Sequence, residues 1–265
     1  MASAGASRMR DIDPAHLIAL NAGRAEARTL TEALAIDHPT LLSAAVPDAP
    51  PELATAAAAA QRLGVLARMT AIGTALSAQL PPERLGALAA HPSDTVRGWA
   101  CFAVGAAGAA GARGAAGGPA VRAVLDRIRP LADDPSFTVR EWAWMAVRPT
   151  LVAELPEAIT ALASWTTDPS PRLRRFASEA LRPRGVWAAH IAPLKASPEL
   201  GEPILEPLRA DPERYVQDSV ANWINDAAKS RPDWAVTLCA RWRTESPGPA
   251  TARIVTRGLR SLAKA

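Results

Sequence analysis

A phrase of fifteen residues occurs four times along the chain, and this repetition restricts the possible folds more than any other feature of the sequence. The four copies occupy residues 91–105, 134–148, 168–182 and 211–225. Each begins with Asp-Pro or His-Pro and reaches an apolar anchor residue five positions later, and successive anchors are separated by 43, 34 and 43 residues. This period is typical of solenoids built from helical hairpins, in which each unit buries its apolar face against its neighbours.

The apolar residues inside each copy follow the spacing of one face of an α-helix. In the third copy they are Leu173, Phe176, Ala177, Ala180 and Leu181, at positions i, i+3, i+4, i+7 and i+8. A second helical segment precedes each copy, and the proline at the start of the copy separates the two helices. The phrase resembles the HEAT repeat and predicts an all-α fold, an α-α superhelix (α-solenoid) of HEAT-like helical hairpins.

The repeats suggest a single domain over residues 1–265. Residues 1–90 are expected to form degenerate N-terminal capping helices, residues 91–245 the HEAT-like repeats, and residues 246–265 a closing helix. One segment, 105–118, contains almost only glycine and alanine and shows no apolar periodicity. We expect this segment to be a flexible surface loop.

The composition argues against a metal site, a membrane span and an oxidising compartment. The two cysteines, Cys101 and Cys239, lie far apart and are expected to be free, buried thiols. The four histidines show no metal-ligand spacing, so we predict no metal site. No apolar run approaches the ~18 residues of a membrane span. The N-terminus also lacks the apolar segment of a secretory signal, which favours a cytoplasmic protein.

The charge is concentrated in the third copy. Residues 172–184 hold five arginines and one glutamate, a local excess equal to the net charge of +4 for the whole chain. Arg175, Glu179 and Arg182 can form a ladder along one side of a helix. This ladder is either an ordinary solvated surface or part of a site for a polyanion, because guanidinium groups bind phosphate oxygens in pairs. Trp187 follows directly and could stack on a base or sugar.

A second polar group ends the fourth copy. Asn222, Asn225 and Asp226 lie at i, i+3 and i+4, which places them on one side of a helix. A carboxylate near a helix C-terminus opposes the helix dipole, so the position is mildly unfavourable for Asp226. A solvated surface aspartate and a functional carboxylate are both compatible with this pattern.

The stretches RRFASEALRPRGVW and DPERYVQDSVANWINDAAKSRPD resemble the HEAT-like DNA alkylation-repair family, and its AlkC branch more than its AlkD branch. The stretch VREWAWMAVRP is similar to the preceding repeat of that branch, so the resemblance covers about residues 91–245. It implies a monofunctional DNA glycosylase of base excision repair, which hydrolyses the N-glycosidic bond of 3-methyladenine-type purines and in some members of 7-methylguanine. It also implies that no metal or organic cofactor is required.

The resemblance assigns roles to individual residues. Asp226 corresponds to the main stabiliser of the sugar cation and orienter of water, Glu179 to a carboxylate lining the lesion pocket, and Glu141 to a third catalytic carboxylate. Trp187 corresponds to an aromatic wall against the lesion. The further candidates for DNA contacts are Trp144, Arg140, Arg148, Arg174, Arg175, Arg182 and Arg184.

The residues alone leave two other functions open. The chain could be a solenoid that binds DNA without excising a base, or a HEAT scaffold that binds proteins through a solvated Arg/Glu ladder. The glycosylase hypothesis predicts double-stranded DNA containing alkylated purines as partner, with nucleoid association when bound, and a monomer as the acting species. Since DNA binding by arginines releases counterions, salt dependence separates the two DNA-binding hypotheses from the scaffold.

Overall fold

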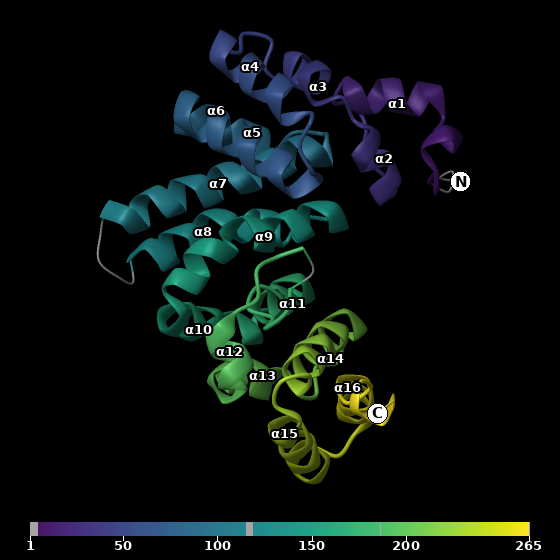
Figure 1. Ribbon diagram of the computed structural model, residues 1–265, viewed down its shortest axis with the longest axis vertical. Coiled ribbons are helices and arrows are strands. Elements are labelled where there is room, and N and C mark those ends of the chain that lie inside the picture. The colour runs from purple at the N-terminus through teal and green to yellow at the C-terminus, as the bar shows by residue number, and fades with distance from the viewer. Residues whose placement is uncertain (1–4, 115–118, 186, 265) are drawn as a thin grey trace. The chain divides into compact units, whose positions relative to one another are not determined.

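The computed structural model describes residues 5–114, 119–185 and 187–264, and this part of the chain contains helices and no strand. The chain forms two compact units, which we describe separately (Figure 1). Unit 1 comprises Met1–Gly114 and Val124–Val147, and unit 2 comprises Ala115–Ala123 and Arg148–Ala265. The all-α repeat fold expected from the sequence is confirmed, while the single-domain organisation stays a prediction.

The helices of unit 1 are mostly short, and several of them begin at a proline or after a capping side chain. Asp13, Thr29 and Asp37 each cap a helix by accepting a hydrogen bond from a backbone N–H of its first turn. The helices are η1 (Met9–Asp11), α1 (Pro14–Asn21), α2 (Leu30–Ala35), α3 (His38–Ala45), α4 (Pro51–Ala60), α5 (Val65–Gln79), α6 (Pro82–Ala89), α7 (Asp94–Gly114), most of α8 (Pro119–Ala132) and the larger part of α9 (Phe137–Ala153).

Unit 2 continues from the last part of α9. It holds α10 (Leu155–Ala163), η2 (Ser164–Thr167), α11 (Pro171–Glu179), α12 (Ala192–Ala196), η3 (Pro198–Gly201), α13 (Glu202–Leu205), η4 (Glu206–Leu208), α14 (Arg214–Ala228), α15 (Pro232–Glu245), α16 (Pro249–Gly258) and η5 (Leu262–Lys264). Helix α14 is central to this unit and packs against α11, α15 and α16. The closing helical segment expected after residue 245 is α16.

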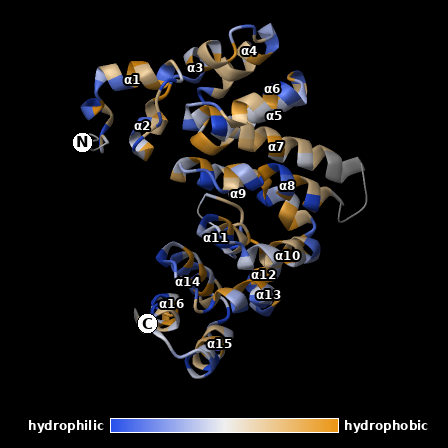
Figure 2. Ribbon diagram, turned by 180° about the vertical axis from the view of Figure 1, so that it is seen from behind, coloured by the Kyte–Doolittle hydropathy of each residue, from blue (hydrophilic) through white to orange (hydrophobic). Residues whose placement is uncertain are grey.

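The four repeated phrases form α7, α9, α11 and α14, as their periodicity predicted. Their anchors Val96, Val139, Leu173 and Val216 are all buried. The helices before them are α6, α8, α10 and the short α13. Most helices carry both hydrophobic and hydrophilic residues along the ribbon (Figure 2), in agreement with amphipathic hairpins that bury one side against a neighbour.

The glycine- and alanine-rich segment was predicted incorrectly as a loop over 105–118. Residues 105–114 continue α7, while 115–118 lie outside the described residues. Alanine is the best helix former, so an alanine-rich run extends a helix without amphipathic periodicity. Gly105 has a packing role within this helix, because a Cβ there would collide with the carbonyl oxygen of Ala146 in α9. The glycine therefore lets the two helices approach closely.

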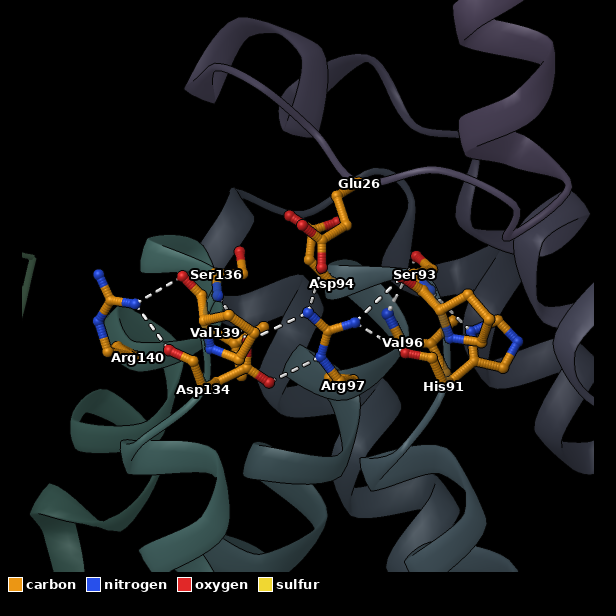
Figure 3. Close-up of polar contacts among 12 residues, drawn as sticks. Glu26, His91, Ser93, Asp94, Val96, Arg97, Asp134, Ser136, Val139 and Arg140 are labelled. Carbon is orange, nitrogen blue, oxygen red and sulfur yellow. Dashed lines mark hydrogen bonds and ion pairs between the residues drawn. The ribbon is translucent and has the colours of Figure 1, made fainter. Parts of the chain in front are cut away.

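The residue after each anchor closes the turn that opens its repeat. Arg97 donates to the carbonyls of His91 and Pro92, and Arg140 donates in the same way to those of Asp134 and Pro135 (Figure 3). The equivalent side chains in unit 2, Arg174 and Gln217, donate to the carbonyls at the same offsets.

Two of these arginines also bind the aspartate that begins the next repeat. Arg97 contacts Asp134, and Arg174 contacts Asp211, in each case through two nitrogen atoms. Arg97 additionally forms an ion pair with Glu26, which precedes α2 (Figure 3). Buried charge is tolerated here because each charged group has an opposite partner and hydrogen bonds.

Both cysteines are free and buried, as expected. Within the described ranges, no helix combines the length and the apolar character that crossing a lipid bilayer requires.

Candidate functional site

Two carboxylates from neighbouring repeats of unit 2 meet at a single arginine. Arg182 donates through Nη1 to Glu179 Oε1 at 2.7 Å and through Nε to Asp226 Oδ2 at 3.0 Å, and its Nη2 forms an ion pair with the same Oδ2 at 2.8 Å. All three residues are buried, with exposed fractions of 3% for Glu179, 3% for Asp226 and 8% for Arg182. The arrangement is a charged network shielded from solvent, and the alternative of a solvated surface ladder does not describe it.

The local sequence places Arg182 where it can reach both acids. Helix α11 ends at Glu179, and Pro183 disfavours helical backbone at the preceding residue. The carbonyl of Leu181, which the helix leaves unpaired, accepts a hydrogen bond from Trp223 Nε1 of α14 at 3.1 Å. Arg182 therefore lies in a turn that faces α14, and its guanidinium spans the two helices.

Glu179 is held on both of its oxygens. Oε2 accepts a hydrogen bond from Ser219 Oγ of α14 at 2.6 Å and lies 3.6 Å from Arg175 Nη2. Burial alone would raise the pKa of Glu179, but the charges of Arg175 and Arg182 and the hydrogen bonds from Ser219 and Arg182 lower it below its ordinary value. Glu179 is therefore ionised at neutral pH despite its burial.

Asp226 is held on only one oxygen. Arg182 occupies Oδ2, whereas Oδ1 lies 3.6 Å from Lys229 Nζ. Among the described residues, Oδ1 accepts no hydrogen bond, in contrast to both oxygens of Glu179. The neighbouring Asn225 also has a buried side-chain oxygen with no hydrogen-bond partner in the described structure. Asp226 thus offers the carboxylate oxygen of the cluster that is best able to face an incoming positive charge.

The segment that follows Arg182 carries an exposed tryptophan. Trp187 is 54% exposed and has a φ of 58°, a left-handed conformation that is uncommon for a bulky residue. The segment is fastened to α14 by Arg184, which donates to the carbonyl of Asp226 at 3.2 Å and to Ser230 Oγ at 2.7 Å. The strained backbone conformation of Trp187 is characteristic of residues displayed for a function.

The buried side chain of Arg148 also binds the segment around Trp187. Its guanidinium donates to the carbonyls of Ala180, Arg182 and Ala189 at 2.7, 2.7 and 3.1 Å. Burial, together with the charge of Arg182, lowers the pKa of Arg148 to about 10, so it stays charged at neutral pH. The expectation that Arg148 contacts DNA stays a prediction, while in the structure the side chain is buried and donates to three backbone carbonyls.

Several other predicted site residues make contacts of their own. Trp144 is 1% exposed and donates through Nε1 to Glu141 at 2.8 Å, and its stacking contact with DNA stays a prediction. Glu141 belongs to unit 1 and Glu179 and Asp226 to unit 2. Arg140 and Arg174 close the turns of their repeats, as described above, and Arg174 is also paired with Asp211. Their main contacts serve the fold.

A row of arginines was missed by the sequence analysis. Arg253 donates to Asp218 at 2.7 Å, Arg257 lies 3.0 Å from Asp218, and Arg260 donates to Asn222 at 2.8 Å. They lie in α16 and the turn after it, along the side of α14 that ends at Asp226. Their spacing of i, i+4 and i+7 was a readable signal for one helix face.

The wider site is strongly cationic. Its seven basic side chains outnumber its three carboxylates, which are Glu179, Asp218 and Asp226. The basic residues are Arg175, Arg182, Arg184, Lys229, Arg253, Arg257 and Arg260. Such a surface attracts phosphate groups, while its carboxylates can stabilise a cation held among them. In the part of the chain that the structure describes, no three His, Cys, Asp or Glu side chains gather as metal ligands.

Comparisons with known proteins were made for the sequence and for the fold. No protein-family model matches the chain. The chain is 38% identical over 102 residues to Uncharacterized protein YhaZ of Bacillus subtilis (strain 168), in an alignment that covers 38% of this chain and 29% of YhaZ.

Two solved structures share the fold. Pseudomonas fluorescens alkylpurine DNA glycosylase AlkC, bound to DNA containing an abasic site analog, matches with a TM-score of 0.66 and 25% identity, covering 98% of this chain and 66% of AlkC. AlkD2 from Streptococcus mutans matches with a TM-score of 0.60 and 17% identity, covering 79% of this chain and 96% of AlkD2. The chain therefore spans just under two thirds of AlkC and less than a third of YhaZ.

Proposed function

Because this chain belongs to the AlkC/AlkD superfamily of HEAT-like repeat proteins, we propose that it is a monofunctional DNA glycosylase that removes cationic N-alkylated purines from double-stranded DNA. One observation carries the proposal most directly. Two buried carboxylates from neighbouring repeats converge on Arg182, inside a surface whose other charges are mainly basic. This combination suits a substrate that is anionic along its backbone and becomes positive at one sugar.

The chemistry of the substrate explains why carboxylates suffice. A purine alkylated on a ring nitrogen is positively charged and leaves as a neutral base, so general-acid assistance contributes little. The sugar then develops oxocarbenium character, which an ionised carboxylate stabilises. A water positioned by the same carboxylate completes the hydrolysis. This reaction is a proposal for this chain, with 3-methyladenine as the first substrate to test and 7-methylguanine as the second.

The geometry supports different roles for the two acids. Asp226 has an oxygen that accepts no hydrogen bond in the described structure, so we assign to it the contact with the sugar cation and the water. Glu179 has both oxygens engaged, and we assign to it the ionic environment that keeps Arg182 in place. Glu141 is not included in this pair.

We assign DNA contacts to exposed groups of unit 2. Trp187 would lie against the lesioned nucleotide, and Arg257 and Arg260 would bind phosphates beside Asp226. One copy of the chain supplies every residue of the cluster, which supports a monomer as the acting species.

The decisive experiment is the release of free base from duplex DNA containing 3-methyladenine. The wild-type protein should release 3-methyladenine, and Asp226→Asn should not, while Asp233→Asn serves as a control because Asp233 is an exposed acid near the start of α15. DNA binding without base release by the wild-type protein would instead identify a non-catalytic DNA-binding solenoid. The absence of both activities would favour a protein scaffold.

The term monofunctional has its own test. Lys229 Nζ lies 3.6 Å from Asp226, and an amine near an abasic site could attack its aldehyde. Borohydride would trap such a covalent imine with the product DNA. A monofunctional enzyme forms no trapped complex under conditions in which it releases base.

A further inference from the structure

The buried guanidinium of Arg148 contacts both the turn that carries Arg182 and the residues that follow Trp187. Its Nη1 binds the carbonyl of Ala180, and its Nη2 binds those of Arg182 and Ala189. The first two carbonyls belong to the turn from which the Arg182 side chain reaches Glu179 and Asp226. The third lies two residues beyond Trp187. One planar group thus binds the segment 180–189, of which residues 180–185 and 187–189 are described, close to both of its ends.

Other hydrogen bonds also hold the described part of this segment, among them the one from Trp223 Nε1 to the carbonyl of Leu181. Its backbone hydrogen bonds include Ala188 N to the carbonyl of Gly185, at 3.4 Å, and Ile191 N to the carbonyl of Pro183, at 3.0 Å. The left-handed backbone of Trp187 is strained for a residue with a bulky side chain and persists only when the surroundings impose it. Arg148 binds the carbonyl of Ala189, and Arg184 binds the carbonyl of Asp226, so contacts to the rest of unit 2 are made within three residues of Trp187 on each side.

A glycine provides the space that this contact needs. A Cβ on Gly185 would lie 3.3 Å from Arg148 Cζ and 3.4 Å from Nη2. The segment therefore passes close to the guanidinium, and an additional methyl group would be tight against Arg148 Cζ and require a small shift of one of them. A lysine cannot replace Arg148, because an ammonium lacks the planar fork that reaches carbonyls in different directions.

We propose that Arg148 is a positioning residue, which orients Trp187 for contact with the lesion and holds Arg182 in register for the two carboxylates. Its catalytic consequence depends on the proposed glycosylase function, whereas its control of the segment 180–189 does not. The role differs from direct phosphate binding, because the guanidinium is buried and faces protein carbonyls.

The test compares Arg148→Lys and Gly185→Ala with Arg97→Lys as a matched control. Arg97 is also buried and also binds two backbone carbonyls and a carboxylate, but it belongs to unit 1. The tryptophans are labelled with 5-fluorotryptophan, and the ¹⁹F resonance of Trp187 is identified by its loss in Trp187→Phe. Both unit 2 variants should shift or broaden this resonance in the free protein, and Arg97→Lys should leave it unchanged.

A kinetic readout separates positioning from general instability. In Arg148→Lys the rate of base release at saturating DNA should fall on the order of a hundredfold, while the Kd for undamaged duplex stays within about threefold. An unchanged Trp187 resonance in folded Arg148→Lys overturns the proposal. An equal loss of DNA affinity also overturns it, because that result indicates a phosphate contact.

The two proposals can fail independently. If the wild-type protein releases no base, the glycosylase proposal fails, but the ¹⁹F comparison still decides whether Arg148 controls the segment. If Arg148→Lys does not fold, Gly185→Ala perturbs the same contact from the opposite side and provides the same readout.

Discussion

Glu179 and Asp226 lie 47 positions apart in the sequence, yet one guanidinium, that of Arg182, donates to both. The contact crosses from the turn after α11 to the C-terminal part of α14. The positive charge of Arg182 offsets the repulsion between the two carboxylates and so stabilises both of them in the protein interior. This network and the other paired or buried charges of the chain lead to the following predictions for substitutions.

Replacement of Asp226 by asparagine should abolish base release without unfolding the protein. Asparagine keeps an oxygen that can accept from Arg182, but it loses the charge that stabilises the sugar cation. We expect a rate decrease on the order of 10²–10³, the loss typical of one electrostatic group aimed at a transition state. Single-turnover release of 3-methyladenine measures the rate, and circular dichroism checks the fold. A variant as active as Asp233→Asn would remove Asp226 from the mechanism.

Arg182→Met should be strongly destabilising at neutral pH. It leaves Glu179 and Asp226 buried without their shared partner, and breaking a buried pair typically costs about 3–5 kcal/mol. The free energy of unfolding, measured by urea titration at about pH 7.5, gives this cost. A loss below about 1 kcal/mol would mean that solvent or another cation already stabilises the acids.

The pH dependence of the same variant has a defined sign. In the wild type the pKa of Glu179 lies below the value near 4.3 of an unfolded glutamate. The stabilisation is therefore complete above about pH 4.3 and is lost as the pH falls through the folded pKa. Without Arg182 the effect of burial becomes larger relative to the remaining attraction, so the folded variant takes up a proton more readily. The deficit of Arg182→Met should thus be smaller at about pH 4.5 than at about pH 7.5.

A buried acid of unit 1 should show the opposite dependence. Burial raises the pKa of Asp94 to about 6, and one of its side-chain oxygens has no hydrogen-bond partner in the described structure. The penalty on its charged form is absent below the unfolded pKa near 3.9 and complete above about pH 6. Asp94→Asn should therefore stabilise the protein by about 1–3 kcal/mol at about pH 7.5 and by little at about pH 4.

The stability of Asp94→Asn is best compared with that of Asp134→Asn. Asp134 accepts two hydrogen bonds from Arg97 (Figure 3), so the loss of its charge should destabilise the protein. Thermal unfolding of both variants at the two pH values measures the difference. A loss of stability in both variants at neutral pH would contradict the assignment of a penalty to Asp94.

The arginines of α16 and the turn after it should contribute to DNA affinity in a salt-dependent way. Arg257→Gln and Arg260→Gln should each weaken binding to undamaged duplex and reduce the slope of log K against log salt by about one. Arg243→Gln is the control, because Arg243 is exposed in the last turn of α15. Fluorescence anisotropy at several salt concentrations provides the slopes. An unchanged slope in both variants would place the phosphate contacts elsewhere.

The repeats could be predicted from the sequence because their apolar periodicity is local. Spacing alone was enough to recognise the anchors. It also identified the helix that contains each anchor and the helix that precedes it. The extension of α7 through residues 105–114 was not, because its helix depends on alanine propensity and on the close approach of Gly105 to Ala146. Apolar periodicity reports neither the helix propensity of alanine nor the close approach of two helices.

The residues of the candidate site could be named from the sequence, but their burial could not. The sequence analysis named Glu179, Arg182 and Asp226 as candidates and left open whether their helix faces are solvated or part of a site. In a stack of hairpins each inner helix has neighbours on several sides, so positions six and nine residues after an anchor are buried as well. These are the positions of Glu179 and Arg182, and of Arg148 in the preceding repeat. A helical wheel describes one helix and cannot represent burial by a neighbour.

The arginines that close the repeat turns have a consequence for how such a chain grows. Arg97 and Arg174 each donate to carbonyls in the turn that opens their own repeat, and each also binds the first aspartate of the next repeat. A duplicated hairpin would bring its own closing side chain and also the aspartate that its predecessor requires. Evolution could therefore lengthen or shorten the array by whole repeats, because a copied repeat contains both residues that form the arginine–aspartate contact with its neighbours.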